Sequence, residues 1–416
     1  MTMPQSKKLF YLEDIAELQN GGAWKENEYA DTGVCVVRVT DCQSGTIDLR
    51  SCKHLPITSF NKYSKHKLLS NDLVIATVGS HPTQPGSVVG RTSVVPQKAS
   101  GALLNQNAVR VRAKNDILDQ GFLNLFSKTE QFKNYIISHA RGAANQVRMS
   151  LELLRKMPIE LPPLPTQRRI ASILSAYDDL IENNTRRIAI LEEMARRLYE
   201  EWFVNFRFPG HETARFVETE LGPVPEGWEV VALEDIANEV RDAVNPGQVH
   251  QDTPYVGLEH IPRRSITLCE WGTAANVNSS KLIFKKRDIL FGKIRPYFHK
   301  VATAPIDGIC STDTILIRPK QHSFYSIVLC SVSSDAFVSH AVQTSNGTKM
   351  PRADWKVLKK YLVAFPKNGV LKRFNEVIVD AVEQTQNLMF KNANLRAQRD
   401  LLLPKLISGE LDVSEA

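Results

Sequence analysis

Pro165-Thr166-Gln167-Arg168-Arg169-Ile170 opens a stretch that continues to Trp202-Phe203-Val204 with no further proline and no glycine. Apolar or small residues recur along it in alternating steps of four and three, which is the 3.5-residue period of a coiled coil. The stretch therefore predicts one long helix of about 38 residues, or roughly 57 Å, with an apolar stripe that needs a partner helix. The stripe consists of Ile170, Leu174, Tyr177, Ile181, Asn184, Ile188, Leu191, Ala195, Leu198 and Trp202.

A second stretch has the same alternation of four- and three-residue steps. Its first stripe residue, Phe374, lies 204 residues after Ile170, the first residue of the first stripe. Two matched helices separated by a large insert predict an intramolecular helix pair. Asn184, Asn392 and Arg399 interrupt the stripes. A buried Asn can set the register of a helix pair. The alternative is that one flank of the apolar seam is solvated. The second stripe consists of Phe374, Ile378, Ala381, Thr385, Leu388, Asn392, Leu395, Arg399, Leu402 and Leu406.

The composition is that of an ordinary globular protein. The 416 residues are enough for two to four domains, with 43% hydrophobic and 23% charged residues. No apolar run approaches the ~18 residues of a membrane span, and the start of the chain lacks a signal-peptide pattern. Six cysteines occur without any Cys-x-x-Cys pair, which predicts buried thiols in a reducing cytoplasm and neither disulfides nor zinc.

The charge distribution points to an anionic partner. The net charge is +7, and residues 1–150 hold 18 Lys and Arg against 12 Asp and Glu, whereas the first long helix is nearly balanced. A basic globular segment beside a neutral helix suits a DNA-reading domain on a spacer. The doublets Arg186-Arg187, Glu192-Glu193, Arg196-Arg197 and Glu200-Glu201 are typical of solvated i,i+4 pairs, although part of that face could hold another subunit.

The globular segments repeat each other. Leu12–Ala16 returns as Leu233–Ala237, and Asp72–Ile75 returns as Asp288–Phe291, with the order of matched segments unchanged. We predict an α+β protein with two similar mixed α/β domains, separated by two long antiparallel coiled-coil helices in a pseudo-two-fold repeat. The predicted boundaries are 1–160 for the first domain, 161–210 for the first long helix, 211–366 for the second domain, and 367–416 for the second helix and tail.

No catalytic motif emerges from the residues. The chain has no phosphate-binding Gly-x-x-x-x-Gly-Lys, no Gly-x-Gly-x-x-Gly and no Asn-Pro-Pro-aromatic tetrapeptide, and its histidines lack metal-ligand spacing. Asp307 with Asp354-Trp355-Lys356 could form a nuclease-type Asp…Asp-x-Lys set, but such a tripeptide often arises by chance.

Matched polar loops favour binding over catalysis. The loop Gly292–Tyr297 offers two cations, an aromatic ring and a glycine at a strand end, and Gly79–Arg91 is its counterpart. Lys and Arg can neutralise phosphates, and Asn or Gln can read adenine, although each residue alone could equally belong to a surface turn. The DNA-binding candidates are Ser80, His81, Gln84, Arg91, Asn145, Gln146, Arg148, Lys293, Arg295, Tyr297, Asn346, Thr348, Lys349 and Arg352.

Two motifs carry a resemblance to a known family. The segment Leu161-Pro162-Pro163-Leu164-Pro165-Thr166-Gln167-Arg168-Arg169-Ile170, with the helix ending Leu198–Phe203, resembles the first conserved region of the specificity subunits of type I restriction–modification enzymes. Leu395–Glu410 resembles the second. One departure is Pro366-Lys367-Asn368-Gly369, which replaces the fuller proline motif before the second helix and leaves its start undefined.

The resemblance implies a non-catalytic subunit that reads double-stranded DNA. Each domain would recognise half of a split target, and the helices would set the gap between the halves. Two modification (methyltransferase) subunits and restriction/translocase subunits would be the partners. They would bring S-adenosylmethionine, ATP and Mg, so that this chain needs no cofactor. Two alternatives stay open: a stand-alone DNA methyltransferase or nuclease, and a coiled-coil scaffold that binds proteins.

Overall fold

The computed structural model describes residues 7–43, 45–84, 86–114, 116–143, 146–366 and 369–413. The chain forms two compact units, Met1–Asp179 with Leu395–Ala416, and Leu180–Asn394. The division falls inside both long helices, so each unit holds one globular domain and part of the helix pair. We call these globular parts the first and the second domain.

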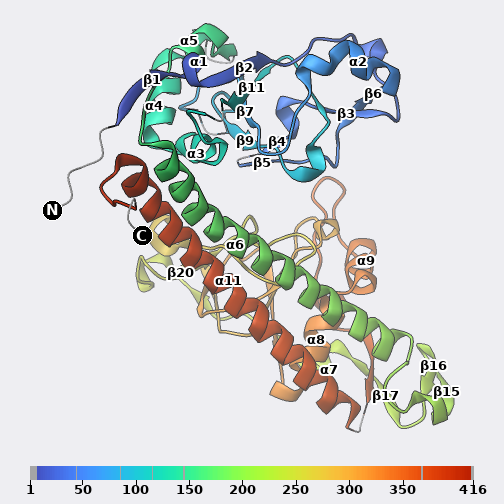
Figure 1. The fold of residues 1–416 in the computed structure, drawn as a ribbon. Helices are drawn as coiled ribbons and strands as arrows, with labels where there is room; N and C mark the ends of the chain where they lie inside the picture. The colour runs from blue at the N-terminus through green and yellow to red at the C-terminus, as the bar shows by residue number, and fades with distance from the viewer. Residues whose placement is uncertain are drawn as a thin grey trace. The chain divides into compact units, whose positions relative to one another are not determined.

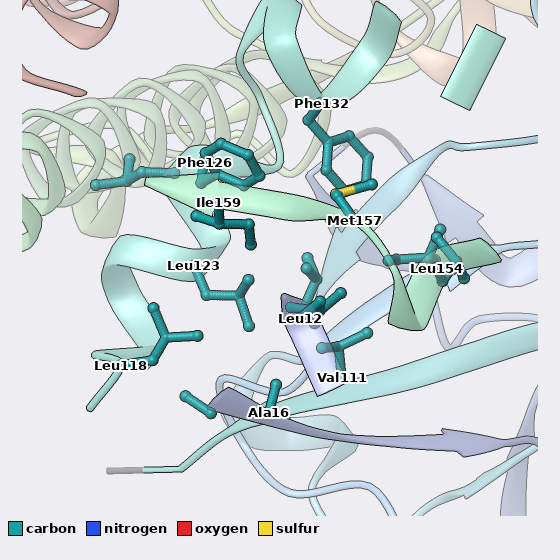
Figure 2. Close-up of a cluster of buried hydrophobic side chains, with 14 of the residues drawn as sticks. Leu12, Ala16, Val111, Leu118, Leu123, Phe126, Phe132, Leu154, Met157 and Ile159 are labelled. Carbon is teal, nitrogen blue, oxygen red and sulfur yellow. The ribbon is translucent and has the colours of Figure 1, made fainter. Parts of the chain in front are cut away.

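The first domain is built on a four-stranded antiparallel sheet in the order β2-β11-β7-β9, formed by Ala16–Asn20, Ala108–Ala113, Leu73–Ala76 and Thr92–Val94. Every residue of β7 is buried. Apolar side chains of α3 (Gln120–Phe126), α4 (Glu130–His139) and the sheet gather in one core that includes Leu12, Phe126 and Ile159 (Figure 2). Ile170 and Leu174 of the first long helix belong to the same core.

The ends of the first domain meet, because β1 (Lys8–Tyr11) pairs antiparallel with β14 (Pro158–Leu161), directly before the long helix. The remaining strands form the small sheets β10-β3-β6 and β12-β13-β8 and the hairpin β4-β5. The remaining elements of this domain are α1 (Leu12–Ile15), β3 (Val34–Val37), β4 (Cys42–Gln43), β5 (Thr46–Ile47), β6 (Lys53–Leu55), α2 (Phe60–Tyr63), β8 (Val78–Gly79), β10 (Leu103–Leu104), β12 (Arg141–Ala143), β13 (Gln146–Arg148) and α5 (Leu151–Arg155).

The second domain repeats this topology, which confirms the predicted repeat. Its sheet β18-β26-β23-β24 matches β2-β11-β7-β9, and β17 pairs with β27 as β1 pairs with β14. A five-stranded sheet, β19-β22-β25-β20-β21, accompanies it. The elements are β15 (Phe216–Thr219), β16 (Gly222–Pro225), β17 (Trp228–Ala232), α7 (Leu233–Ile236), β18 (Ala237–Val240), β19 (Ala243–Val244), β20 (Pro254–Val256), β21 (Gly272–Thr273), β22 (Lys281–Phe284), β23 (Ile289–Gly292), β24 (Val301–Thr303), β25 (Gly308–Cys310), β26 (Thr314–Pro319), α8 (Tyr325–Val332), α9 (Asp335–Gln343), α10 (Trp355–Leu358) and β27 (Leu362–Pro366).

One ion pair occupies the same place in both domains. Arg112 holds Asp72 through two hydrogen bonds of 2.7 Å, and Arg318 holds Asp288 through two of 2.7 Å. Both carboxylates are buried at the start of the central strand, where fork-to-fork pairing supplies the hydrogen bonds that a buried charge requires. Charge-assisted hydrogen bonding to Asp288 raises the pKa of Arg318, so the guanidinium stays protonated.

The two predicted long helices are present and run antiparallel (Figure 1). They are α6 (Leu164–Tyr199), which continues into a π-helical turn at Glu200–Val204, and α11 (Val370–Ser408). In the second unit Ile188 packs in one cluster with Leu388, and further along α6 Tyr199 packs near Phe374, so the residue numbers run in opposite directions. Because α11 begins at Val370, the helix starts just after the glycine of the divergent motif; Lys367 and Asn368 lie outside the described residues.

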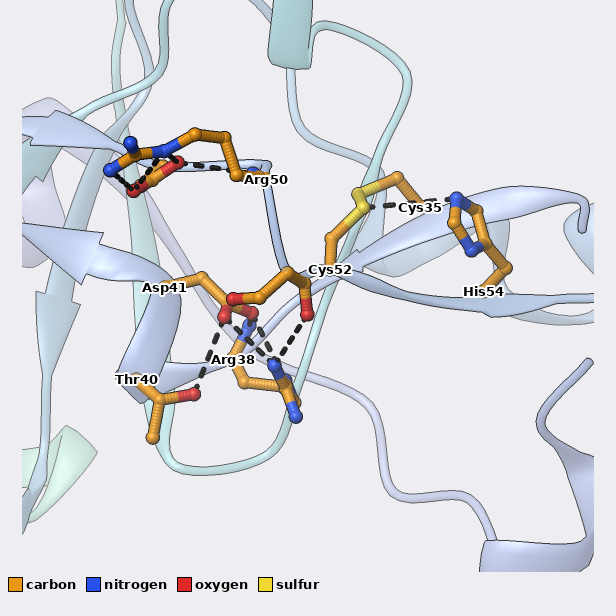
Figure 3. The surroundings of a disulfide bond; sticks show 9 residues. Cys35, Arg38, Thr40, Asp41, Arg50, Cys52 and His54 are labelled. Carbon is orange, nitrogen blue, oxygen red and sulfur yellow. Dashed lines mark hydrogen bonds and ion pairs between the residues drawn. A yellow bond between two sulfur atoms is a disulfide. The ribbon is translucent and has the colours of Figure 1, made fainter. Parts of the chain in front are cut away.

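The prediction of buried thiols without disulfides is wrong for Cys35 and Cys52, and it is also wrong for Cys269, which is exposed. Cys35 and Cys52 form a disulfide with their Cα atoms 6.0 Å apart, linking β3 to the segment before β6 (Figure 3). His54 lies beside this bond, with Nε2 3.8 Å from Cys52 Sγ. Cys42, Cys310 and Cys330 are buried thiols, as predicted, and burial raises the pKa of Cys310 to about 12. The pair was missed because 16 residues and a hairpin separate the two cysteines in the chain.

Across the part of the chain that the structure describes, no single helix combines the length and hydropathy of a membrane span. The stretch His322–Val332 with Asp335–Gln343 reaches that hydropathy only as a pair bent by 64°. Every residue of α8, which lies in this stretch, is buried in the second domain, so its hydropathy reflects core packing.

Candidate nucleic-acid interface

In the first domain, backbone pairing brings the two predicted polar loops together. Strand β8, which opens the loop Gly79–Arg91, pairs antiparallel with β13, placing Gly79 opposite Val147 and Val78 opposite Arg148. The side chain of Arg148 is exposed on this small sheet. Asn145 lies outside the described residues, as does the side chain of Gln146. The structure therefore places Arg148 beside the start of the other loop.

Most polar groups of the loop Gly79–Arg91 hold the loop itself. The Ser80 carbonyl accepts a hydrogen bond of 2.7 Å from Ser87 Oγ, and His81 Nδ1 lies 2.8 Å from Thr83 Oγ1. Arg91 is half-buried and donates to the carbonyls of Cys42 and Ser87, each at 3.3 Å. Only Gln84 among the four candidates of this loop has an exposed side chain. The backbone of Ser80 and the side chains of His81 and Arg91 therefore hold the loop in shape, and Arg91 also ties the loop to Cys42.

The second domain brings its two predicted loops together at the matching place. Ile294 and Arg352 form an isolated antiparallel bridge. The Arg295 N–H donates to the Pro351 carbonyl at 2.7 Å, and the Ala353 N–H donates to the Lys293 carbonyl at 2.9 Å. Both domains therefore join the loop after the central strand to the loop before the final short helix.

These joined loops present a cluster of cations. Lys293, Arg295, Lys349 and Arg352 all lie on them, with Asp313 as the acidic neighbour, 4.0 Å from Lys293 Nζ and 3.9 Å from Arg352. Lys293 also donates to the Thr312 carbonyl at 2.5 Å. Arg295 adopts a left-handed backbone, φ 51°, and its Nε is buried without a hydrogen bond, so its guanidinium is partly enclosed. The excess of positive charge suits phosphate contacts.

Exposed side chains surround the cations. Tyr297 is 52% exposed and its ring lies against Phe298, with 4.8 Å between ring centroids. Asn346, Thr348, Lys349 and Arg352 are exposed on the second loop. A set of aromatic, amide, hydroxyl and cationic groups on one surface can contact both the phosphates and the base edges of a duplex.

Sequence reasoning missed Arg263, whose guanidinium lies 4.0 Å from the centroid of the Phe298 ring. This cation–π contact adds a further cation to the loop. Burial and the charge of Arg263 lower the pKa of Lys300, which follows the same loop. The doublet Arg263-Arg264 was the available signal in the sequence, but only the fold brings Arg263 to Phe298.

All the predicted seam residues are buried or half-buried. In the second unit, the two seam asparagines face each other, with Asn184 Nδ2 donating to Asn392 Oδ1 at 2.9 Å and both residues buried. In the first unit Arg399 pairs with Asp178 at 2.5 Å. Asn184 and Asn392 are therefore matched to each other and buried, whereas Arg399 is matched to the partly exposed Asp178 beside the seam.

The residues of the nuclease alternative have other partners. Asp307 accepts from the Lys286 N–H at 2.8 Å and pairs with Lys285 at 3.1 Å. Asp354 caps α10 by accepting from the Lys356 N–H at 2.9 Å. Within the described ranges no group of three or more His, Cys, Asp or Glu residues is placed to hold a metal ion.

Comparison with known proteins relates the chain to one family. Residues 4–193 match the family model of the type I restriction modification DNA specificity domain. The type I restriction enzyme MjaIX specificity subunit of Methanocaldococcus jannaschii is 24% identical over 326 residues, covering 75% of this chain and 73% of that protein. The HindI specificity subunit of Haemophilus influenzae is 23% identical over 359 residues, covering 70% of this chain and 76% of that protein.

The fold has a counterpart among solved structures. The S subunit of a type I restriction–modification system from M. genitalium superposes with a TM-score of 0.61 at 14% identity, covering 98% of this chain and 97% of that one. At this identity the likeness concerns the fold, which is shared along almost the whole length of both chains.

Proposed function

We propose that this chain, a member of the family of type I restriction–modification specificity subunits, is the subunit that reads DNA sequence in such an enzyme. Each domain would read one half of a bipartite target in double-stranded DNA, and the helix pair would set the distance between the halves. The observation that carries the proposal is the repeated loop arrangement, joined by β8 and β13 in one domain and by Ile294 and Arg352 in the other.

The side chains on these loops support DNA as the ligand. Lys293, Lys349 and Arg352 would neutralise phosphates, a contribution that does not depend on the DNA sequence. Gln84 and Asn346 are exposed amides of the kind that pair with adenine in the major groove. A mixture of both classes is what a sequence reader requires, because phosphate contacts position the protein and base contacts specify the sequence.

The proposal leaves the chemistry to partner subunits in the cytoplasm. Two modification subunits would bind S-adenosylmethionine and methylate the target, and restriction/translocase subunits would use ATP and Mg for cleavage. The family membership supports this division, since the relatives are named as specificity subunits of larger enzymes.

The test is genome-wide detection of methylated adenine by single-molecule sequencing, in cells that carry the modification subunit with and without this chain. We expect a split motif that appears only when the chain is present, with two specific halves around an unspecific spacer. If the assembled complex leaves methylation unchanged, the DNA-reading proposal falls and the protein-binding scaffold becomes the better account.

A further inference from the structure

One carboxylate of α6 binds the second domain instead of solvent. Glu192 belongs to a doublet that the sequence predicts to be solvated, yet Glu192 Oε1 accepts hydrogen bonds from the loop Ser265–Thr267. The donors are Ser265 Oγ at 2.7 Å, the Ile266 N–H at 3.0 Å, the Thr267 N–H at 2.9 Å and Thr267 Oγ1 at 2.6 Å. Hydrogen bonds to an ionised acceptor are about twice as strong as neutral ones, so this is a firm attachment.

The loop that Glu192 holds continues into the candidate DNA-binding surface. The Arg264 N–H donates to the His299 carbonyl at 2.9 Å, and the Thr303 N–H donates to the Ile266 carbonyl at 2.9 Å. Arg263, one residue further, stacks on Phe298. Residues 263–266 are thus tied to the loop that carries Lys293, Arg295 and Tyr297, on the side where that loop returns to β24.

The neighbouring carboxylate shows that this is a property of Glu192 alone. Glu193 pairs within α6, with Arg196 at 2.8 Å and with Arg197 at 2.5 Å, and these side chains are substantially exposed. Those two guanidinium groups lower the pKa of Glu193 to about 2. Glu193 therefore provides a matched control that carries the same charge on the same helical turn without holding the domain.

We infer that Glu192 is a positioning residue, which holds the DNA-reading loop of the second domain at a set orientation on α6 and so contributes to discrimination at one half-site. This inference rests on the proposed function and deepens it. Loss of the carboxylate would leave the residues of the DNA-reading loop unchanged. It would release residues 263–266, to which that loop is bonded, from α6. Base readout needs sub-ångström placement, whereas phosphate contacts tolerate more movement, so specificity suffers before affinity.

The experiment compares Glu192→Ala, Glu192→Gln and Glu193→Ala in the complete complex reconstituted with the modification subunits. Methylation rates are measured on the cognate duplex and on duplexes with one base changed in either half-site. Asn346→Ala, which removes an exposed amide of the kind that reads bases, identifies the half-site that the second domain reads. We expect Glu192→Ala to reduce discrimination in that half-site by about tenfold or more and to leave the other unchanged. Glu192→Gln keeps an acceptor oxygen and should retain most of the discrimination in that half-site. Glu193→Ala should discriminate as well as the wild type in both half-sites.

A second variant and a second readout keep the inference open to refutation. Thr267→Val removes one hydrogen bond to Glu192 without removing the charge, and decides the question if Glu192→Ala does not assemble. Amide hydrogen exchange at Ile266 and Thr267 should accelerate in Glu192→Ala. The positioning role is overturned if Glu192→Ala discriminates bases in both half-sites as well as the wild type does. If Glu192→Ala does not assemble, the same result with Thr267→Val overturns it. Absence of split-site methylation by the wild-type complex overturns the proposed function itself.

Discussion

At the scale of single residues, the contacts of Gln167 explain why a glutamine stands in the motif that opens α6. Its side chain is 1% exposed, and its Oε1 accepts from the Asp119 N–H at 2.9 Å. Its Nε2 donates to the carbonyls of Ile117 at 3.0 Å and Pro162 at 2.9 Å. An uncharged amide offers both an acceptor and two donors, so one side chain satisfies three buried backbone groups and fastens the helix to the first domain.

Replacing Gln167 should therefore destabilise the first unit. We expect Gln167→Ala to lower the free energy of unfolding by about 1–3 kcal/mol, because three backbone groups lose their partners in a buried site. Gln167→Glu should cost at least as much, since a carboxylate cannot donate to two carbonyls. Chemical denaturation of the full chain measures both. Arg169→Ala, at an exposed position of the same turn, is the control and should change stability by less than about 0.5 kcal/mol. Equal effects of Gln167→Ala and Arg169→Ala would contradict this account.

At the scale of elements, the buried asparagine pair sets the register of two long helices. The repeating apolar stripes of these helices would otherwise allow several registers. Asn184 bonds to Asn392, and Asn392 Nδ2 also lies 3.4 Å from the Ile181 carbonyl and 3.3 Å from Thr185 Oγ1. A shift of one helix by a heptad would break this bond, placing Asn392 against Tyr177 or Leu191 and Asn184 against Thr385 or Arg399. The pair therefore selects one register, at a cost in stability relative to an apolar pair.

The asparagine pair should behave as a coupled unit. We expect Asn184→Leu to destabilise the second unit by about 1–3 kcal/mol, because the amide of Asn392 is left buried without its partner. The double change Asn184→Leu with Asn392→Leu should recover most of this loss, giving a coupling energy of at least about 0.5 kcal/mol. A double-mutant cycle of unfolding free energies provides the measurement. Additive effects of the two changes would show that the pair does not act together.

At the scale of the whole molecule, the lengths of α6 and α11 bear on how far apart two half-sites can lie. Their 36 and 39 residues correspond to roughly 54 and 58 Å at ~1.5 Å per residue. Under the proposed function, a helix pair of this length would act as a spacer, and its length would depend on the number of heptads.

Lengthening both helices should lengthen the unread spacer of the DNA target. Seven residues inserted after Ile188 and seven after Leu388, which pack in one cluster, keep the 3.5-residue seam continuous. We expect the spacer to grow by about three base pairs, because seven residues add about 10.5 Å and each base pair about 3.4 Å. Sequencing of methylated sites reads the spacer directly. An unchanged motif from an assembled, active complex would refute the spacer role of the helices.

The sequence by itself determined the features that depend on local periodicity and on repetition. The 3.5-residue stripe specifies α6 and α11, because an apolar stripe of that period can be buried only against another helix. The recurrence of Leu12–Ala16 and Asp72–Ile75 predicted two domains of one topology, since similar segments in the same order fold alike. The polar loops were found in the same way, as matched insertions after the central strand.

Only the tertiary structure decided what each side chain does. The structure shows that His81 and Arg91 bond within their own loop, that Glu192 holds the second domain, and that Cys35 bonds with Cys52. None of these roles follows from local pattern, because each depends on which atom a distant segment places within about 3 Å, the reach of a hydrogen bond. The doublet Glu192-Glu193 has the sequence pattern of a solvated pair. Only the fold shows that the backbone N–H groups of Ile266 and Thr267 bind Glu192.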